Sequence, residues 1–146
     1  MSELLGVDGL TIQYQTSRER LQAVTEASFS IAENEFFGMV GESGSGKSTL
    51  SKALIGLLDP NGEIVEGEIR FKGEPIQDYT EADFNREIRW KEISIIPQSS
   101  MNSLDPIERL DKQAVELART PNDWSKARTL EELTDLFDIV GLPAER

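Results

Sequence analysis

The residues of this sequence that are best placed to do chemistry lie in one short glycine-rich stretch. It fits the pattern G-x-x-x-x-G-K-[ST] and consists of Gly41, Glu42, Ser43, Gly44, Ser45, Gly46, Lys47, Ser48 and Thr49. Glycines permit positive φ angles and a close approach of the backbone, so inward-facing N–H groups can form a cradle for phosphate. We therefore expect this glycine loop (residues 41–49) to bind the phosphates of a nucleotide.

Individual positions of the glycine loop have distinct expected roles. Lys47 is expected to reach the β- and γ-phosphates, and the hydroxyl of Ser48 is expected to hold Mg²⁺. Ser45 and Thr49 would add contacts to the α- and β-phosphates, with Ser43 a weaker candidate. The alternative is a flexible Gly/Ser loop that binds nothing.

The elements around the glycine loop argue for the nucleotide. The apolar run 36–40 predicts a buried strand before the loop, and apolar residues at helical spacing predict a helix over 50–58 after it. The N-terminus of such a helix favours an anion because it carries free N–H donors and partial positive charge. The breaker 59–62 would then end the helix.

Further elements follow from periodicity and turn residues. Runs 10–14 and 27–31 alternate in polarity and predict an antiparallel pair of strands, with polar turns at 16–20 and 33–35. Asn34 can adopt positive φ in the second turn. The next residues predict a strand over 67–71 followed by a tight turn, and then a helix from Glu81 to about Trp90 that is capped by Thr80 and Asp83. A buried strand is expected over 93–96 and a loop over 101–106. Two helices are expected over 107–118 and 130–140, and Gly141 and Pro143 would stop the second one.

Composition limits the classes of protein that fit. The chain has 146 residues, the size of one domain, and no cysteine, which excludes disulfides and thiolate metal sites. Its net charge is −12, from 27 acidic and 15 basic residues, and such a surface repels nucleic acid and anionic lipid. No apolar run is long enough to span a bilayer. We expect a soluble, cytosolic protein that reaches a membrane only through a partner.

The order of these motifs resembles the ATP-binding cassette (ABC) ATPases, and more narrowly the ATP-binding subunits of dipeptide and oligopeptide importers. The likeness is carried by the glycine loop, by the strand that starts at Gly67, and by the stretch 96–106, and it runs along the whole chain. It implies an α/β fold: a P-loop NTPase core of the ABC type, with a small N-terminal antiparallel β-subdomain and the start of a helical subdomain. The implied ranges are 1–35 for the antiparallel part, 36–98 for the core and 99–146 for the helical part.

The resemblance also implies roles for two residues outside the loop. Gln98 matches the glutamine of the family's Q-loop, whose amide can reach Mg²⁺ or the attacking water and whose loop faces the transport partner. The alternative is a polar residue that ends a strand. Tyr14 matches the aromatic residue that stacks on adenine, and such stacking is worth roughly 1–3 kcal/mol per base. The alternative is a strand tyrosine packed in the small sheet.

By this resemblance the parent protein would bind Mg²⁺ and ATP, pair with a second ATP-binding subunit, and contact an integral membrane permease through the Q-loop region. ATP hydrolysis would drive peptide import from the cytoplasmic face of the membrane, with no nucleic acid involved. The family's signature, its Walker B strand and its switch histidine are missing from this sequence, which has no histidine at all. We therefore expect an N-terminal portion that lacks the C-terminal half of the fold and hydrolyses ATP negligibly by itself.

Two alternatives remain open. One is a soluble ABC-type ATPase without a permease, such as a repair or translation ATPase, which the acidic charge and the stretch 96–106 disfavour. The other is a truncated nucleotide-binding or assembly module that binds partners without catalysis.

Overall fold

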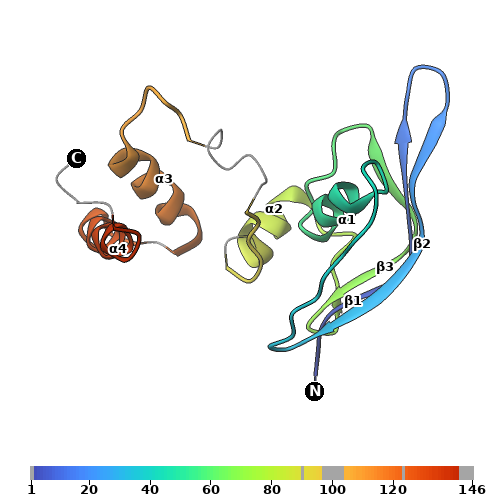
Figure 1. Cartoon of the computed structure of the whole chain (residues 1–146), viewed down its shortest axis with the longest axis horizontal. Coiled ribbons are helices and arrows are strands. Elements are labelled where there is room, and N and C mark those ends of the chain that lie inside the picture. Colours follow the sequence, from blue (N-terminus) through green and yellow to red (C-terminus); the bar gives the residue numbers. More distant parts are fainter. Residues whose placement is uncertain (1, 90, 97–103, 123, 142–146) are drawn as a thin grey trace. The chain divides into compact units, whose positions relative to one another are not determined.

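The computed structural model describes residues 2–89, 91–96, 104–122 and 124–141 (Figure 1). The chain forms two compact units, Met1–Phe84 and Asn85–Arg146. The first unit contains a β-sheet and the helix α1, and the second contains the helices α3 and α4.

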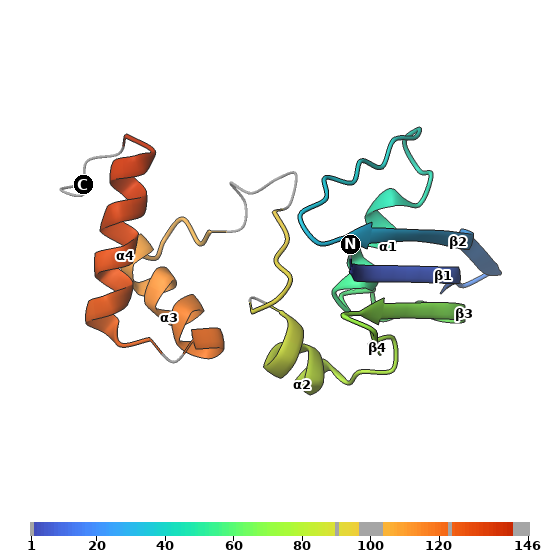
Figure 2. The same cartoon turned by 90° about the horizontal axis from the view of Figure 1, so that it is seen from below.

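The sheet of the first unit has four antiparallel strands. They are β1 (Glu3–Gln15), β2 (Arg20–Ala32), β3 (Gly62–Phe71) and β4 (Glu74–Pro75), in the spatial order β2-β1-β3-β4 (Figure 2). The strands that contain 10–14 and 27–31 form the predicted antiparallel pair, and both are longer than expected. In their register 10–14 lies opposite 21–27, and 27–31 lies opposite 5–10. The turns are also confirmed, because Asn34 has a φ of 62° and Lys72 with Gly73 joins β3 to β4. The sheet thus includes β3 and β4 in addition to the two strands within the range 1–35 that was expected for the antiparallel part.

The three long strands are irregular at the same level of the sheet. On the β2 side the register of β1 shifts between Glu3 and Leu5 and again between Val7 and Gln13, and on the β3 side it shifts between Asp8 and Ile12. In β2, Glu26 has a φ of 47°, and its N–H donates to the buried hydroxyl of Thr11 at 3.2 Å. Bulges of this kind bend a strand and increase its twist.

The core of the first unit lies between this sheet and the elements on one of its faces (Figure 1). Leu10, Ile12 and Ile69 of the sheet are fully buried, as is Ile76, which follows β4. The helix α1 (Lys47–Leu54) contributes buried Leu50 and Ala53. Burial of such side chains is the main stabilising contribution, at about 1.5–3 kcal/mol for each large one.

The helix α1 is shorter than predicted. It ends at Leu54 rather than near 58, because Gly56 has a φ of 64° and closes a Schellman motif. In that motif the N–H of Gly56 donates to the carbonyl of Ala53 at 3.1 Å, and the N–H of Leu57 donates to that of Lys52 at 2.8 Å. These bonds satisfy the last carbonyls and turn the chain away from the helix axis.

Two predicted strands are wrong. The segment 36–40 has no strand pairing, and in 93–96 only Ile93 forms an isolated parallel bridge, to Arg89. Their apolar side chains are largely exposed, with fractions of 98% for Val40 and 89% for Ile96. One ring is partly covered, since Phe37 stacks on Phe29 of β2 with centroids 4.9 Å apart. A buried strand needs a paired neighbour for its backbone N–H and C=O groups, and the described residues form no parallel ladder that could supply one.

The helix predicted from Glu81 begins as expected but is short and changes type. Thr80 and Asp83 form a reciprocal capping box, in which the N–H of Asp83 donates to the Thr80 hydroxyl at 3.2 Å and the N–H of Thr80 donates to the Asp83 carboxylate at 3.1 Å. The α-helical part α2 spans Glu81–Asp83 and passes directly into a π-helical turn, η1 (Phe84–Ile88). Trp90, the predicted end, lies outside the described residues.

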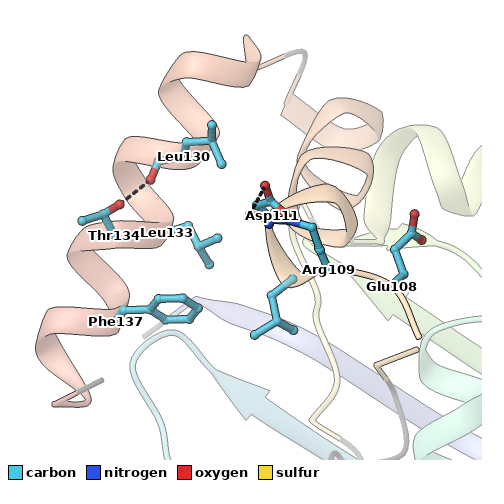
Figure 3. Close-up of a pocket in the computed structure, with 8 residues that line it drawn as sticks. Glu108, Arg109, Asp111, Leu130, Leu133, Thr134 and Phe137 are labelled. Atoms are coloured by element: carbon cyan, nitrogen blue, oxygen red, sulfur yellow. Dashed lines mark hydrogen bonds and ion pairs between the residues drawn. The ribbon is translucent and has the colours of Figure 1, made fainter. Parts of the chain in front are cut away.

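The second unit contains the two last predicted helices, α3 (Leu110–Asn122) and α4 (Lys126–Ile139), which pack against each other. Leu130, Leu133 and Phe137 point from α4 toward α3 and line a groove of about 550 Å³ (Figure 3). Gly141, two residues after the end of α4, has positive φ, whereas Pro143 lies outside the described residues.

The helix α3 begins three residues later than predicted because a turn occupies 105–108. The amide of Gln113 donates to the carbonyls of Asp105 and Glu108 at 3.0 and 2.9 Å and accepts from the N–H of Asp105 at 2.9 Å. Ile107 therefore lies in the turn and is exposed. None of the helices in the described part of the chain combines the length and apolar character needed to cross a membrane.

Candidate nucleotide-binding site

The glycine loop leads directly into α1, as the sequence predicts. Gly46 is the N-cap residue, with φ of 86° and ψ of −1°, and Lys47 is the first residue of the helix. No side chain caps this end, and the first turn of α1 holds no acidic residue. The first amides of the helix are therefore left for an external acceptor, and the helix dipole favours an anion there.

Lys47 folds back over the loop that precedes it. Its ammonium donates to the carbonyl oxygens of Gly41 and Glu42 at 2.9 and 2.6 Å and to the hydroxyl of Ser45 at 3.0 Å. These three contacts use all the donors of an ammonium group. They hold the positive charge inside the curve of the glycine loop, where a phosphate oxygen would be a stronger, charge-assisted acceptor than a neutral carbonyl.

Gly46 is required by its backbone angle and by its neighbour. Its φ of 86° disfavours every residue with a side chain. In addition, a Cβ at this position would overlap the carbonyl oxygen of Ala23 in β2. Gly44 has a similar φ of 81°, but a Cβ there would meet open space. The start of α1 is thus seated directly on the edge strand β2.

The remaining loop residues lie at the surface. Glu42, Ser43 and Ser48 are exposed, and Thr49 is half-buried. The Ser48 hydroxyl makes no hydrogen bond within the described residues, so it is open to a cation held by a bound phosphate. In the part of the chain that the structure describes, no group of three or more acidic residues could hold a metal by itself.

Tyr14 lies near the end of the central strand β1 and is half-buried. Its hydroxyl donates to the carboxylate of Asp59 at 3.4 Å, and the same carboxylate accepts from the ammonium of Lys52 in α1 at 2.9 and 3.0 Å. The hydrogen bond that the Lys52 ammonium donates to Asp59 lowers the pKa of Asp59 and raises the pKa of Lys52. No hydrogen bond or ring contact joins Tyr14 to residues 41–49 within the described chain.

Of the predicted site residues, 41–49 lie together at the start of α1. Tyr14 is connected to the later part of the same helix through Asp59 and Lys52. Gln98 lies outside the described residues, so its role stays a prediction. Sequence reasoning missed Lys52 and Asp59. The only sequence signal for them is that each lies in or next to an element already singled out.

The pattern of the ABC transporter family matches residues 24–146, which include the glycine loop and α1. The match covers most of the sequence, and the chain therefore belongs to the ABC transporter family.

Curated relatives agree with this assignment. The dipeptide transport ATP-binding protein DppD of Lactococcus lactis is 39% identical over 142 residues, which are 97% of this chain and 40% of that protein. The oligopeptide transport ATP-binding protein OppD of Escherichia coli is 38% identical over 143 residues, 98% of this chain and 42% of that protein. OppD of Bacillus subtilis is 34% identical over 144 residues, 98% of this chain and 40% of that protein. The chain thus spans less than half the length of these relatives.

Proposed function

We propose that this chain is the N-terminal part of an ATP-binding subunit of a peptide importer. Residues 1–35 and 36–98 would belong to its antiparallel β part and phosphate-loop core, and 99–146 to the start of its helical subdomain. The observation that carries the proposal is the uncapped start of α1, with the ammonium of Lys47 held inside the glycine loop. The names of the relatives, all transport ATP-binding proteins, support the transport role over a non-transport ATPase.

In the proposed site, the glycine loop and the N-terminus of α1 bind the phosphates of ATP, and Lys47 moves from the loop carbonyls to the β- and γ-phosphates. Ser48 ligates Mg²⁺, which shields the charge of the phosphates. Tyr14 stacks on adenine, and Gln98 contacts Mg²⁺ or the attacking water. The partners are a second ATP-binding subunit and a membrane permease, contacted through the Q-loop region at the cytoplasmic face.

Isothermal titration calorimetry with Mg·ATP and Mg·ADP tests the phosphate site. We expect binding by the folded chain and a loss of at least about tenfold in affinity for Lys47→Ala, since a charge-assisted contact is worth about 1.5–3 kcal/mol. Lys72→Ala is the matched control, because it removes the same charge from the β3–β4 turn. Absence of nucleotide uptake by folded wild-type chain, or equal losses in the two variants, contradicts the proposal.

Turnover tests the extent of the site. Because the sequence lacks the family's Walker B and signature segments, we expect nucleotide binding without steady phosphate release by this chain alone. Steady release that disappears in Lys47→Ala would show that residues 1–146 already hold a complete catalytic site.

A further inference from the structure

The ring of Tyr14 is held in place by the turn Asp59–Gly62, which connects α1 to β3. Asp59 accepts a hydrogen bond from the Tyr14 hydroxyl at 3.4 Å. Gly62 is the partner of Tyr14 across the β1–β3 ladder, and a Cβ at Gly62 would come within 2.7 Å of the Cε1 atom of Tyr14. The ring therefore lies directly over Gly62, with its polar tip at Asp59.

The turn is itself fastened to the end of β1. The N–H of Gln15 donates to the carbonyl of Asn61 at 2.8 Å, and the Asn61 side-chain amide donates to the carbonyl of Gln15 at 3.0 Å. Within the turn, the N–H of Gly62 donates to the carbonyl of Asp59 at 2.7 Å. These bonds fix both the backbone next to Tyr14 and the residue that its hydroxyl contacts.

Asp59 is also bound to α1, through its bidentate contact with the ammonium of Lys52. Lys52 lies five residues after Lys47, a separation of roughly 7.5 Å along the helix axis. The helix α1 thus carries Lys47 of the glycine loop at its start and, in its last turn, Lys52, which binds the carboxylate that Tyr14 contacts. In a nucleotide, the α-phosphate and ribose likewise separate the base from the terminal phosphates.

We propose that the Asp59–Gly62 turn, anchored to α1 by Lys52, holds Tyr14 at the position where it receives the base of the nucleotide. Asp59 is a positioning residue, because it acts through Tyr14. This inference rests on the proposed function, in which the glycine loop binds the phosphates and Tyr14 contacts the base. It adds that base and phosphate contacts are spaced by a single helix.

Two variants of the full 146-residue chain remove the hydroxyl–carboxylate contact from opposite sides, Tyr14→Phe and Asp59→Ala. Affinities are measured by calorimetry for Mg·ATP and for Mg·tripolyphosphate, which has no base. We expect Tyr14→Phe to weaken ATP binding by about three- to tenfold, the range for one hydrogen bond, and to leave the affinity for tripolyphosphate unchanged. Asp59→Ala also removes a charge, so we expect it to weaken ATP binding while its affinity for tripolyphosphate is equal to or higher than that of the wild-type chain. The double variant should lose no more than either single one, because both remove the same contact.

Asp8→Ala is the matched control, since Asp8 is an exposed carboxylate on the same strand. Removing a negative charge by itself would strengthen the binding of an anion, so weaker ATP binding in Asp59→Ala alone cannot come from net charge. Tyr14→Phe keeps the ring and tests the inference independently if Asp59→Ala is poorly folded.

The outcomes separate this inference from the proposed function. If Tyr14→Ala weakens ATP binding while Tyr14→Phe and Asp59→Ala do not, Tyr14 contacts the base without help from Asp59, and the inference is overturned although the proposed function stands. If Tyr14→Ala also has no effect, the base contact itself is wrong. If the wild-type chain binds neither ATP nor tripolyphosphate, the proposed function fails and the inference fails with it.

Discussion

Two glycines of the glycine loop, Gly44 and Gly46, have nearly the same φ angle but different surroundings. Both angles lie in the left-handed region, yet only Gly46 faces a backbone carbonyl, that of Ala23. The pair therefore separates the cost of a backbone conformation from the cost of a steric overlap within one loop.

We predict that Gly44→Ala destabilises the folded chain by about 1–2 kcal/mol, the cost of a left-handed residue with a side chain. Gly46→Ala should cost about 1–3 kcal/mol more, because β2 or α1 must also shift to admit the new methyl group. Urea denaturation followed by circular dichroism measures both. Equal losses would mean that α1 is not seated on β2 as described.

The ion pair of Lys52 with Asp59 gives a pH dependence whose sign follows from the pKa directions. The lowered pKa of Asp59 contributes stability at neutral pH that is lost as the pH falls through that pKa, and the raised pKa of Lys52 contributes stability that is lost as the pH rises through it. We predict that wild type exceeds Asp59→Asn in Tm near neutral pH and that this difference shrinks in both acid and alkali. Asp8→Asn is the control, and a pH-independent difference would contradict the pair.

At the residue scale, the sequence predicted correctly that a loop at 41–46 leads into a helix, but it did not predict the contacts around that helix. The spacing of Gly41, Gly46 and Lys47 alone predicts a phosphate loop, because that chemistry depends on consecutive backbone groups. The contact of Tyr14 with Asp59 joins residues 45 positions apart. It depends on how α1 lies on the sheet, which no local pattern encodes.

At the scale of elements, the capping box of Thr80 and Asp83 is a local feature that sequence predicted correctly. We predict that Thr80→Ala destabilises the chain by about 0.5–2 kcal/mol, because the N–H of Asp83 loses its acceptor. Amide exchange at Asp83 should accelerate accordingly. Thr134→Ala is the matched control, since the Thr134 hydroxyl donates to the carbonyl of Leu130 inside α4 and caps nothing. A smaller effect at Thr80 than at Thr134 would contradict the role of the cap.

Other elements could not be predicted from their own residues. Alternation was sufficient for 10–14 of β1, 27–31 of β2 and 67–71 of β3, but it did not predict the first halves of these strands. The apolar run 36–40 has the composition of a buried parallel strand, but such a strand forms only when a neighbouring strand pairs with it and other elements cover its faces. The end of α1 was missed because a glycine inside a helical pattern, here Gly56, is either tolerated or terminates the helix.

At the scale of the whole chain, the exposed apolar side chains of 36–40 and 93–96 oppose the effect of the net charge. Phe36 is fully exposed, with a fraction of 103%, and Ile96 nearly so. Apolar surface of this kind favours association between copies, whereas a charge of −12 on each copy disfavours it. Salt screens the charge and leaves the apolar term largely intact.

We predict that self-association of the chain increases with salt concentration and decreases in the double variant Phe36→Ser, Ile96→Ser. Sedimentation velocity at several salt concentrations measures both effects. Ile107→Ser is the matched control, because Ile107 is 94% exposed but lies outside the two segments. A monomer at every salt concentration, or an equal reduction by the control, would contradict the role of the two segments.

The matched irregularities of β1, β2 and β3 also restrict how the chain can change in length. They lie side by side in three neighbouring strands, so an insertion in a single strand would move its irregularity out of line with those of the other two. The β1–β2 connection has no such restriction, because its hydrogen bonds are local. The N–H and the hydroxyl of Thr16 donate to the carbonyl of Glu19, and the Thr16 hydroxyl accepts from the N–H of Glu19. Relatives with longer β1 and β2 strands should therefore carry their extra residues at 16–19, in the turn that follows Tyr14 and the irregular part of the sheet.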